Sequence, residues 1–308
     1  MRLSLIAGSA NPPLAERVAR VMGIQLCART DSRFDDGELD IRIEESVRGC
    51  DVYIVQPTSP PADEHLMELL FLADACRRAG ADRLTAVIPY FGYARHDRRA
   101  SGRTPVGGRV VASLLEQGGF QRVVAVDLHN AAIEGFFGGA VEHLSAAPLL
   151  AAALRPSRDA VLVAPDLGAM KLAERYQAHL DLPIAVIHKA RAGSSGVTVR
   201  RLVGDVAGRA PIIVDDMVTT GGTIDAAAKA LLEAGCRPDI TVVATHGLFV
   251  GSAAGRFDAL PVQTIVSDSV VPATAPRRLQ TIGLAPLLAD AIARLHGSQS
   301  LRDLVAHA

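Results

Sequence analysis

The stretch V-D-D-M-V-T-T-G-G-T, residues 214–223, combines two adjacent carboxylates with threonines and glycines. Adjacent acids repel each other, and burying them is costly unless a cation, hydrogen-bond donors or water compensates the charge. The segment Thr219-Thr220-Gly221-Gly222-Thr223 can cradle a phosphate, because glycines let the backbone approach a ligand and a helix start presents unpaired N–H groups. The P-loop pattern G-x-x-x-x-G-K-[ST] is absent from the sequence. Asp215 and Asp216 cannot bind a phosphate themselves, so they predict contacts with sugar hydroxyls or Mg²⁺. The stretch therefore indicates a phosphorylated sugar as ligand.

A second group of side chains is basic and also follows an apolar run. The segment Arg95-His96-Asp97-Arg98-Arg99, with Arg103 and Arg109 after it, is the densest basic stretch of the chain. Arginine suits phosphate because its planar fork bonds two oxygens and keeps its charge. Taken alone, the segment is equally compatible with a solvated loop whose arginines pair with neighbouring acids.

His129 and Asp166 each follow a further apolar run. A lone histidine at such a position is more often a hydrogen-bonded structural residue, and a lone aspartate before a helix is more often an N-cap. Their recurrence beside Asp215 and Asp216 favours a Mg²⁺ site next to a phosphate substrate, because Mg²⁺ prefers oxygen ligands and retains water.

The remaining cationic segment is His188-Lys189-Ala190-Arg191, which precedes the Gly/Ser stretch 193–196. A loop of this composition is expected to be mobile, so the charges of Lys189 and Arg191 can close over a bound anion. A plain hairpin connection is the alternative that this segment leaves open.

Short apolar strands alternating with helices must position these groups. Apolar runs predict strands at Leu3–Ile6, Val52–Val55, Leu84–Ile88, Val123–Val126, Val161–Val163, Ile184–Ile187, Ile212–Val214 and Thr241–Ala244. Apolar residues at i, i+3, i+4 spacing predict one helix over Leu66, Leu69, Leu70, Ala73 and Cys76, and a second over 222–234. Strands that are apolar throughout and joined by helices predict an α/β fold with parallel sheets covered on both faces. Ligands of such sheets bind beyond the carboxyl ends of the strands, which is where the groups above lie.

Length and composition limit the classes of function. The 308 residues fit two domains of about 150 residues, and the connection at Arg155-Pro156-Ser157-Arg158 leads us to predict domains 1–146 and 147–308. A formal net charge of −1 gives no basis for attracting nucleic acid or membranes. No apolar run reaches the length of about 18 residues that a membrane span requires. Four cysteines without C-x-x-C spacing are typical of a reducing cytoplasm.

Taken together, the motifs resemble those of the ribose-phosphate pyrophosphokinase family. The stretch 214–223 is similar to the phosphoribosyl-pyrophosphate loop that this family shares with type I phosphoribosyltransferases. Further segments match the pyrophosphokinases in the family's order: R-F-D-D-G-E-L (33–39), E-S-V-R-G-C-D-V-Y-I-V-Q (45–56), E-H-L-M-E-L-L (64–70), I-P-Y-F-G-Y-A-R-H-D-R-R (88–99), V-D-L-H (126–129), G-F-F (135–137) and A-P-D-L-G (164–168). The resemblance covers nearly the whole chain.

The resemblance implies two type I phosphoribosyltransferase-like domains, each a mainly parallel sheet flanked by helices, with a C-terminal helix that packs back on the first domain. It implies Mg²⁺-dependent transfer of the diphosphoryl group of ATP to O1 of ribose 5-phosphate, which gives phosphoribosyl pyrophosphate and AMP for nucleotide biosynthesis. It also implies a cytoplasmic homo-oligomer, dimer-based or hexameric, without nucleic-acid or membrane partners. The implied site residues are Phe34, Asp36, Glu38, Arg95, His96 and Asp97 for ATP; His129 and Asp166 for Mg²⁺; Asp215, Asp216, Thr219, Thr220, Gly221, Gly222 and Thr223 for ribose 5-phosphate; and Lys189 and Arg191 for a mobile catalytic loop.

Some positions depart from the family pattern, and two alternatives to an active diphosphokinase stay open. His96 stands where the family usually has Gln, Thr219 where it commonly has Asp, and a family arginine near Ser101-Gly102 is missing. A phosphoribosyltransferase is one alternative, but it does not explain the basic segment or the F-D-D-G-E motif. The other is a non-catalytic regulatory homologue, which the presence of both Lys189 and Arg191 disfavours.

Overall fold

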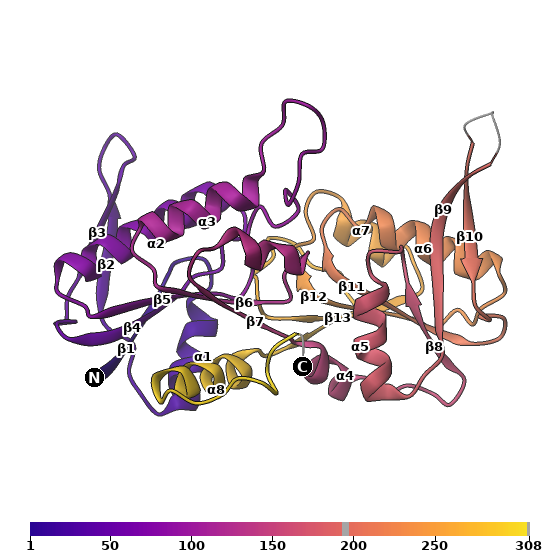
Figure 1. Cartoon of the computed structure of the whole chain (residues 1–308). Coiled ribbons are helices and arrows are strands. Elements are labelled where there is room, and N and C mark those ends of the chain that lie inside the picture. The colour runs from indigo at the N-terminus through magenta and orange to yellow at the C-terminus, as the bar shows by residue number, and fades with distance from the viewer. Residues whose placement is uncertain (193–196, 307–308) are drawn as a thin grey trace. The chain divides into compact units, whose positions relative to one another are not determined.

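The chain forms two compact units, each with its own sheet and apolar core (Figure 1). The computed structural model describes residues 1–192 and 197–306, and the side chains of residues 189–200 lie outside this description. The first unit comprises Met1–Ser145 and Gly283–Ala308, and the second comprises Ala146–Ile282. The division between Ser145 and Ala146 lies one residue before the predicted boundary.

The first unit is built on a parallel five-stranded sheet in the order β1-β4-β5-β6-β7. Its strands are β1 (Arg2–Ala7), β4 (Cys50–Val55), β5 (Arg83–Ile88), β6 (Arg122–Val126) and β7 (Ala140–Leu144). Helices α2 (Ala62–Arg78) and α3 (Gly107–Gln117) cover one face, and α1 (Pro12–Met22) and α8 (Ala285–His296) cover the other (Figure 1). All six residues of β4 are buried, which is why this strand has a continuous apolar pattern rather than an alternating one.

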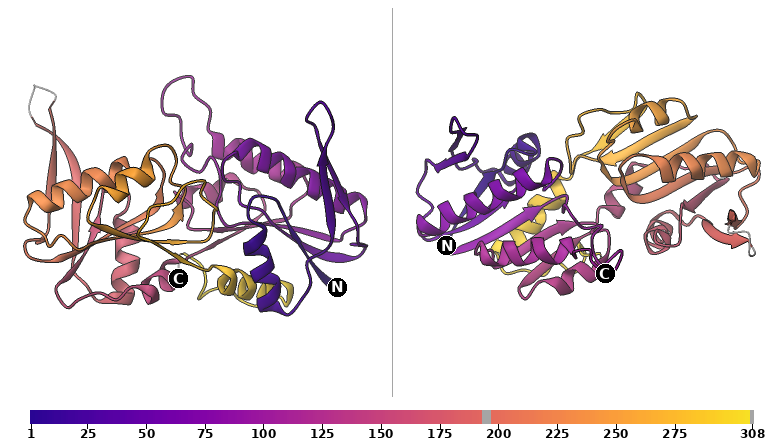
Figure 2. Two further views of the ribbon diagram at one scale, coloured as in Figure 1. Left: turned by 180° about the vertical axis from the view of Figure 1, so that it is seen from behind. Right: turned by 90° about the horizontal axis from the view of Figure 1, so that it is seen from above.

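The C-terminal helix α8 belongs to the first unit, where it packs beside α1 (Figure 2). Its apolar face includes the buried side chains Leu288, Ile292 and Leu295. At its last residue, His296 Nδ1 lies 2.8 Å from Oδ2 of Asp51, a fully buried carboxylate that is also ion-paired with Arg83. This polar anchor and the apolar face together explain why the end of the chain returns to the first sheet.

Two further elements of the first unit lie outside its sheet. Strands β2 (Arg29–Arg33) and β3 (Leu39–Ile43) pair antiparallel as a separate hairpin. A 3₁₀ helix, η1 (Ala131–Phe136), connects β6 to β7. The hairpin was not predicted, because the β2 sequence R-T-D-S-R is polar and mostly exposed and has no apolar run.

The second unit contains a seven-stranded sheet in the order β10-β9-β8-β11-β12-β13-β14. Its strands are β8 (Ala160–Ala164), β9 (Ile184–Ala192), β10 (Val197–Val203), β11 (Ala210–Val218), β12 (Ile240–Gly247), β13 (Val262–Ser267) and β14 (Leu279–Ile282). Strands β9 and β10 pair antiparallel, and the other neighbours pair parallel. Helices α4 (Ala147–Ala153) and α5 (Met170–Leu180) cover one face, and α6 (Gly222–Glu233) and α7 (Ala253–Asp258) cover the other (Figure 1). The predicted mainly parallel sheets flanked by helices are therefore confirmed.

The strand order of the second sheet reverses direction between β8 and β11. The chain passes from β8 outward to β9 and β10, and then returns to the opposite side of β8 to form β11. The loops leaving the carboxyl ends of β8 and β11 therefore diverge to opposite faces of the sheet. In open α/β sheets such a point is where ligands bind.

Two further properties of the fold are the lengths of its helices and the state of its cysteines. No helix within the described residues is long and apolar enough to cross a bilayer. All four cysteines, Cys27, Cys50, Cys76 and Cys236, are buried free thiols.

Candidate functional site

Two adjacent carboxylates lie at the switch point of the second sheet. The prediction that β11 ends at Val214 is wrong, because the strand continues to Val218 and contains both Asp215 and Asp216. Strand β8 pairs with β11 only as far as Ile213, whereas β12 continues alongside β11 to Val218. One edge of β11 is therefore left without a neighbouring strand beyond Ile213, and both acids are half-buried there.

The carboxyl group of Asp215 is in an unfavourable environment for a negative charge. Burial raises its pKa well above the usual range, and the charges of Asp216 and Asp166 raise it further. One compensating contact is the backbone N–H of Asp216, which donates to Asp215 Oδ1 at 3.0 Å. The second unit thus brings together three of the predicted site residues, Asp166, Asp215 and Asp216.

Asp166 lies in the loop between β8 and α5 and is exposed. Its Oδ1 accepts a hydrogen bond from the backbone N–H of Ala169 at 3.1 Å, immediately before the first residue of α5. This bond closes the turn that precedes α5, whose N-cap residue is Ala169 and which no described side chain caps. Asp166 is therefore not the N-cap that the sequence left open as an alternative, and its carboxylate stays exposed.

Replacing Asp215 by asparagine is expected to stabilise the protein at neutral pH. Because the pKa of Asp215 is raised in the folded state, the folded protein binds more protons than the unfolded one between the two pKa values, so stability falls as pH rises through that window. The variant lacks this loss. We expect its Tm at pH 7 to exceed the wild-type value by roughly 2–4 °C for each kcal/mol recovered, with the difference vanishing near the unfolded pKa of about 3.9.

Thermal unfolding of both proteins across this pH range measures the effect. A lower Tm for the variant at pH 7 would contradict the assigned environment of Asp215. The same variant should bind a sugar phosphate more weakly. A higher Tm together with weaker binding would show that the Asp215 carboxylate serves binding and not stability.

The loop 219–223 connects β11 to α6 and has the geometry of an anion cradle. Gly221 adopts φ = 75°, and a Cβ atom there would lie 2.8 Å from Cε2 of Phe257, so the position requires glycine. No side chain in the described part of the chain caps α6, whose first N–H groups are available to a ligand. Thr220 and Thr223 are exposed beside this helix start, and Thr219 is half-buried. Gly222 is the first residue of α6.

The cationic segment 188–191 is not a loop as predicted. Strand β9 continues to Ala192 and pairs antiparallel with β10, so that Lys189 lies opposite Arg200 and Arg191 lies opposite Thr198. The predicted strand ended at Ile187, where the apolar run ends, but pairing with β10 extends β9 to Ala192. The side chains of Lys189 and Arg191, and the whole Gly/Ser stretch 193–196, lie outside the described residues.

In the first unit, the loops that follow β5 and β6 are joined by a hydrogen bond. Asn130 Nδ2 donates to Asp97 Oδ2 at 2.5 Å, and Asn130 directly follows His129. Arg95, His96 and His129 are exposed, and Asp97 is half-buried. The unit therefore brings the Arg95–Asp97 segment close to the loop that carries His129.

His96 is also packed against the start of α3. Its carbonyl accepts the N–H of Gly108 at 3.1 Å, and its ring Nδ1 would lie 3.1 Å from a Cβ atom at Gly107. The lack of a side chain at Gly107 thus allows the start of α3 to approach His96 closely.

Phe34, Asp36 and Glu38 lie at the tip of the β2–β3 hairpin and are exposed. The tip is closed by the N–H of Phe34, which donates to the carbonyl of Glu38 at 2.9 Å, and by Asp36 Oδ1, which accepts the N–H of Glu38 at 3.1 Å. Among the described residues, no hydrogen bond or ion pair connects this tip to residues 95–97. Phe34 is 57% exposed at this tip.

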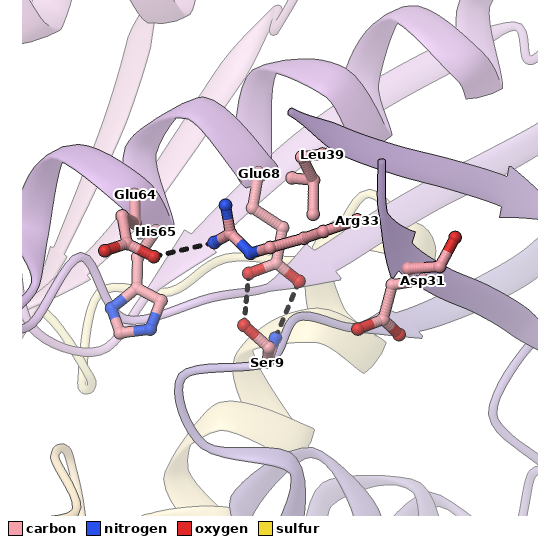
Figure 3. A pocket seen from close by; sticks show the side chains of 8 residues that line it. Ser9, Asp31, Arg33, Leu39, Glu64, His65 and Glu68 are labelled. Carbon is pink, nitrogen blue, oxygen red and sulfur yellow. Dashed lines mark hydrogen bonds and ion pairs between the residues drawn. The ribbon is translucent and has the colours of Figure 1, made fainter. Parts of the chain in front are cut away.

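A pocket of about 260 Å³ lies between this hairpin and α2 (Figure 3). It is lined by Ser9, Asp31, Ser32, Arg33, Leu39, Glu64, His65 and Glu68. Much of its polar lining is already paired: Arg33 binds Glu64 at 2.7 Å, and buried Glu68 accepts the backbone N–H of Ser9 at 2.9 Å. Several of its residues belong to the segments 33–39 and 64–70 that resemble family motifs, but no pattern in the sequence indicates that these two segments meet around a pocket.

The residues proposed for Mg²⁺ come from both units, His129 from the first and Asp166 from the second. Within the part of the chain that the structure describes, no three His, Cys, Asp or Glu side chains are grouped so that they could hold a metal ion. In proteins Mg²⁺ usually binds one or two carboxylates and takes its other ligands from phosphate oxygens and water. The donor chemistry fits, because a divalent cation would offset the repulsion among Asp166, Asp215 and Asp216.

Comparisons with known proteins give a consistent result. Residues 3–119 match the family model of the N-terminal domain of ribose phosphate pyrophosphokinase, and residues 195–306 match that of the phosphoribosyl synthetase-associated domain. The ribose-phosphate pyrophosphokinase of Gloeobacter violaceus is 41% identical over 309 residues, covering 98% of this chain and 93% of the relative. That of Bacillus subtilis is 39% identical, with coverage of 98% and 96%. The crystal structure of phosphoribosylpyrophosphate synthetase from Mycobacterium smegmatis has a TM-score of 0.91 and 38% identity, and covers 97% of this chain and 100% of that chain.

Proposed function

The chain belongs to the ribose-phosphate pyrophosphokinase family, and we propose that it transfers the β,γ-diphosphoryl group of ATP to O1 of ribose 5-phosphate, releasing AMP. The observation that carries this proposal is the meeting of an acidic pair and an anion cradle at the β8/β11 switch point. The carboxylates can accept hydrogen bonds from sugar hydroxyls, and the helix start beside them can bind a phosphate. A phosphorylated sugar carries both groups, so it suits this site better than an unphosphorylated sugar or a free phosphate.

The 5-phosphate is held by the loop 219–223. The backbone N–H groups at the start of α6 and the hydroxyls of Thr220 and Thr223 donate to its oxygens, and Gly221 provides the turn that lets the backbone approach. Asp215 and Asp216 accept hydrogen bonds from the ribose hydroxyls, which fixes the sugar at both ends. O1 is then presented in one orientation, and orientation of reactants accounts for a large share of the catalysis of such transfers.

ATP is bound by residues of the first unit. Arg95 neutralises phosphate charge, while His96 and Asp97 position the nucleotide, with Asp97 held by Asn130. Phe34 receives the adenine by stacking, and Asp36 and Glu38 accept hydrogen bonds from it. An exposed aromatic ring on a hairpin tip is well suited to reach the ATP site of a second copy, so we propose a dimer-based homo-oligomer. We also propose that the protein acts in the cytoplasm.

The charge that develops on the migrating diphosphoryl group is neutralised by Lys189 and Arg191. Mg²⁺, held with the help of His129 and Asp166, would supply charge neutralisation at the phosphates. Phosphoryl transfer depends mainly on alignment and charge neutralisation rather than on covalent chemistry by the protein. No general base for the O1 hydroxyl is needed in this scheme.

The direct test is release of AMP by the purified protein. With ATP, Mg²⁺ and ribose 5-phosphate together, chromatography should detect AMP, and leaving out the sugar phosphate should abolish it. Unphosphorylated ribose is the matched control, because it retains O1 but has no group for the 219–223 cradle. A phosphoribosyltransferase would release no AMP and would instead consume phosphoribosyl pyrophosphate with a nucleobase, and a regulatory homologue would catalyse neither reaction.

A further inference from the structure

We propose that Glu134 and His143 are positioning residues that orient the His129 loop for metal-dependent nucleotide binding. This inference rests on the proposed function, in which His129 helps to hold Mg²⁺. Neither residue belongs to a motif that points to catalysis, and neither contacts the substrates in the scheme above. Their role follows from a chain of hydrogen bonds beneath the loop.

The ring of His143 is held in one tautomer. His143 lies on β7 with its side chain 1% exposed, and its Nε2 is 2.9 Å from the backbone nitrogen of Leu128. A backbone N–H can only donate, so Nε2 must be the unprotonated nitrogen of a neutral imidazole. The proton is therefore on Nδ1, which donates to Glu134 Oε1 at 2.7 Å. Glu134 thus selects the tautomer that can bind the loop.

The segment held in this way is the one that leads from β6 to His129. Asp127 has φ = 38°, a left-handed conformation that is unfavourable for a residue with a side chain. Its N–H donates to the carbonyl of Leu144 on β7 at 3.0 Å, and the next N–H, that of Leu128, donates to His143. Two consecutive backbone groups are therefore fixed to β7. Because His129 comes next in the chain, the position of its backbone depends on this attachment.

A matched control exists in the same unit. His296 and Asp51 form another histidine–carboxylate pair, with Nδ1 2.8 Å from Oδ2. In this pair the carboxylate is buried, whereas in the pair of His143 and Glu134 the histidine is buried. Asp51 lies near the amino end of β4, at the opposite edge of the parallel sheet from the loop 127–129. Loss of this pair should lower stability without affecting the His129 loop, whereas loss of Glu134 should affect both.

The test compares Glu134→Ala, Glu134→Gln and His296→Ala with the wild type, using Mn²⁺ as the probe. Binding of Mn²⁺ in the presence of ATP is measured by electron paramagnetic resonance, and stability by thermal unfolding. We expect Glu134→Ala to bind Mn²⁺ about tenfold more weakly, at the low end of the effect of outer-shell partners. Glu134→Gln, whose amide oxygen can still accept from Nδ1–H, should stay close to wild type, and His296→Ala should lower Tm but leave Mn²⁺ binding unchanged.

Unchanged Mn²⁺ binding in Glu134→Ala, or an equal loss in His296→Ala, would overturn the proposal. A second measurement uses the wild type, so it does not depend on a substitution that could prevent folding. Long-range ¹H–¹⁵N spectra should show His143 with its proton on Nδ1. A proton on Nε2 would overturn the proposal. Both readouts are independent of turnover. If the wild type released no AMP but these results held, the proposed function would fail while the positioning role stood.

Discussion

A Lys189→Ala variant is expected to turn over at least about one hundred times more slowly than the wild type, with little change in KM for ribose 5-phosphate. A cation placed on a transferring phosphoryl group contributes roughly 10³ to 10⁵ in rate in related chemistry. Its effect falls on kcat because the charge it neutralises is greatest in the transition state. The proposed ribose 5-phosphate site, by contrast, lies on β11 and α6 and does not include Lys189.

Lys229→Ala is the matched control for this variant. Lys229 lies on the exposed side of α6 and forms an ion pair with Asp225 at 3.0 Å, so its removal also deletes one positive charge from the second unit. Steady-state kinetics should show nearly unchanged kcat for Lys229→Ala. Equal kcat values for the two variants, or a rise in KM at unchanged kcat for Lys189→Ala, would refute the role assigned to Lys189.

The second large effect is expected for Gly221→Ala. A side chain at φ = 75° costs about 1–2 kcal/mol, and the new Cβ would lie 2.8 Å from the Phe257 ring, which is buried against Phe249. Overpacking of this kind adds about 1–3 kcal/mol. The turn is expected to shift in order to relieve the clash, which would displace the N–H groups that we propose bind the phosphate. Binding of ribose 5-phosphate should therefore be largely lost.

Gly235→Ala separates backbone strain from the clash. Gly235 follows the other end of α6 and has φ = 77°, but a Cβ atom there would meet nothing within 4 Å. The stability of this variant should fall only by the cost of the strained backbone, and the variant should bind ribose 5-phosphate as the wild type does. Chemical denaturation and calorimetric titration with ribose 5-phosphate measure both quantities. The interpretation of the cradle fails if the two variants lose equal stability and bind equally well.

The elements that could be predicted from sequence are those whose burial leaves a local pattern. Strands such as β4 and β8 are buried on both faces, so their apolar runs were recognisable. The glycines of the 219–223 loop were likewise informative, since the φ angle of Gly221 and its closeness to Phe257 need the absence of a side chain. Strand limits were harder to predict, because β9 and β11 are prolonged by pairing with β10 and β12 rather than by their own apolar residues.

Features that depend on tertiary contacts left no signal in the sequence. Strand β2 is polar, so that the alternating apolar residues Leu39, Ile41 and Ile43 of β3 had no recognisable partner strand in the sequence. The hydrogen bonds from Leu128 to His143 and from His143 to Glu134 join residues that no motif connects. The proximity of Asp166 to Asp215 follows from the strand order, since β8 and β11 are neighbours in the sheet but are separated in the chain by β9 and β10.

The central claim is that two phosphoryl groups move together from ATP to O1 of the sugar phosphate. Phosphorus NMR of the complete reaction measures this directly, because it distinguishes AMP from ADP and detects a diphosphate attached at C1 of the ribose. We predict that AMP and the 1-diphosphate of ribose 5-phosphate appear in equal amounts. Formation of ADP, or disappearance of ATP without a new diphosphate ester, would contradict it.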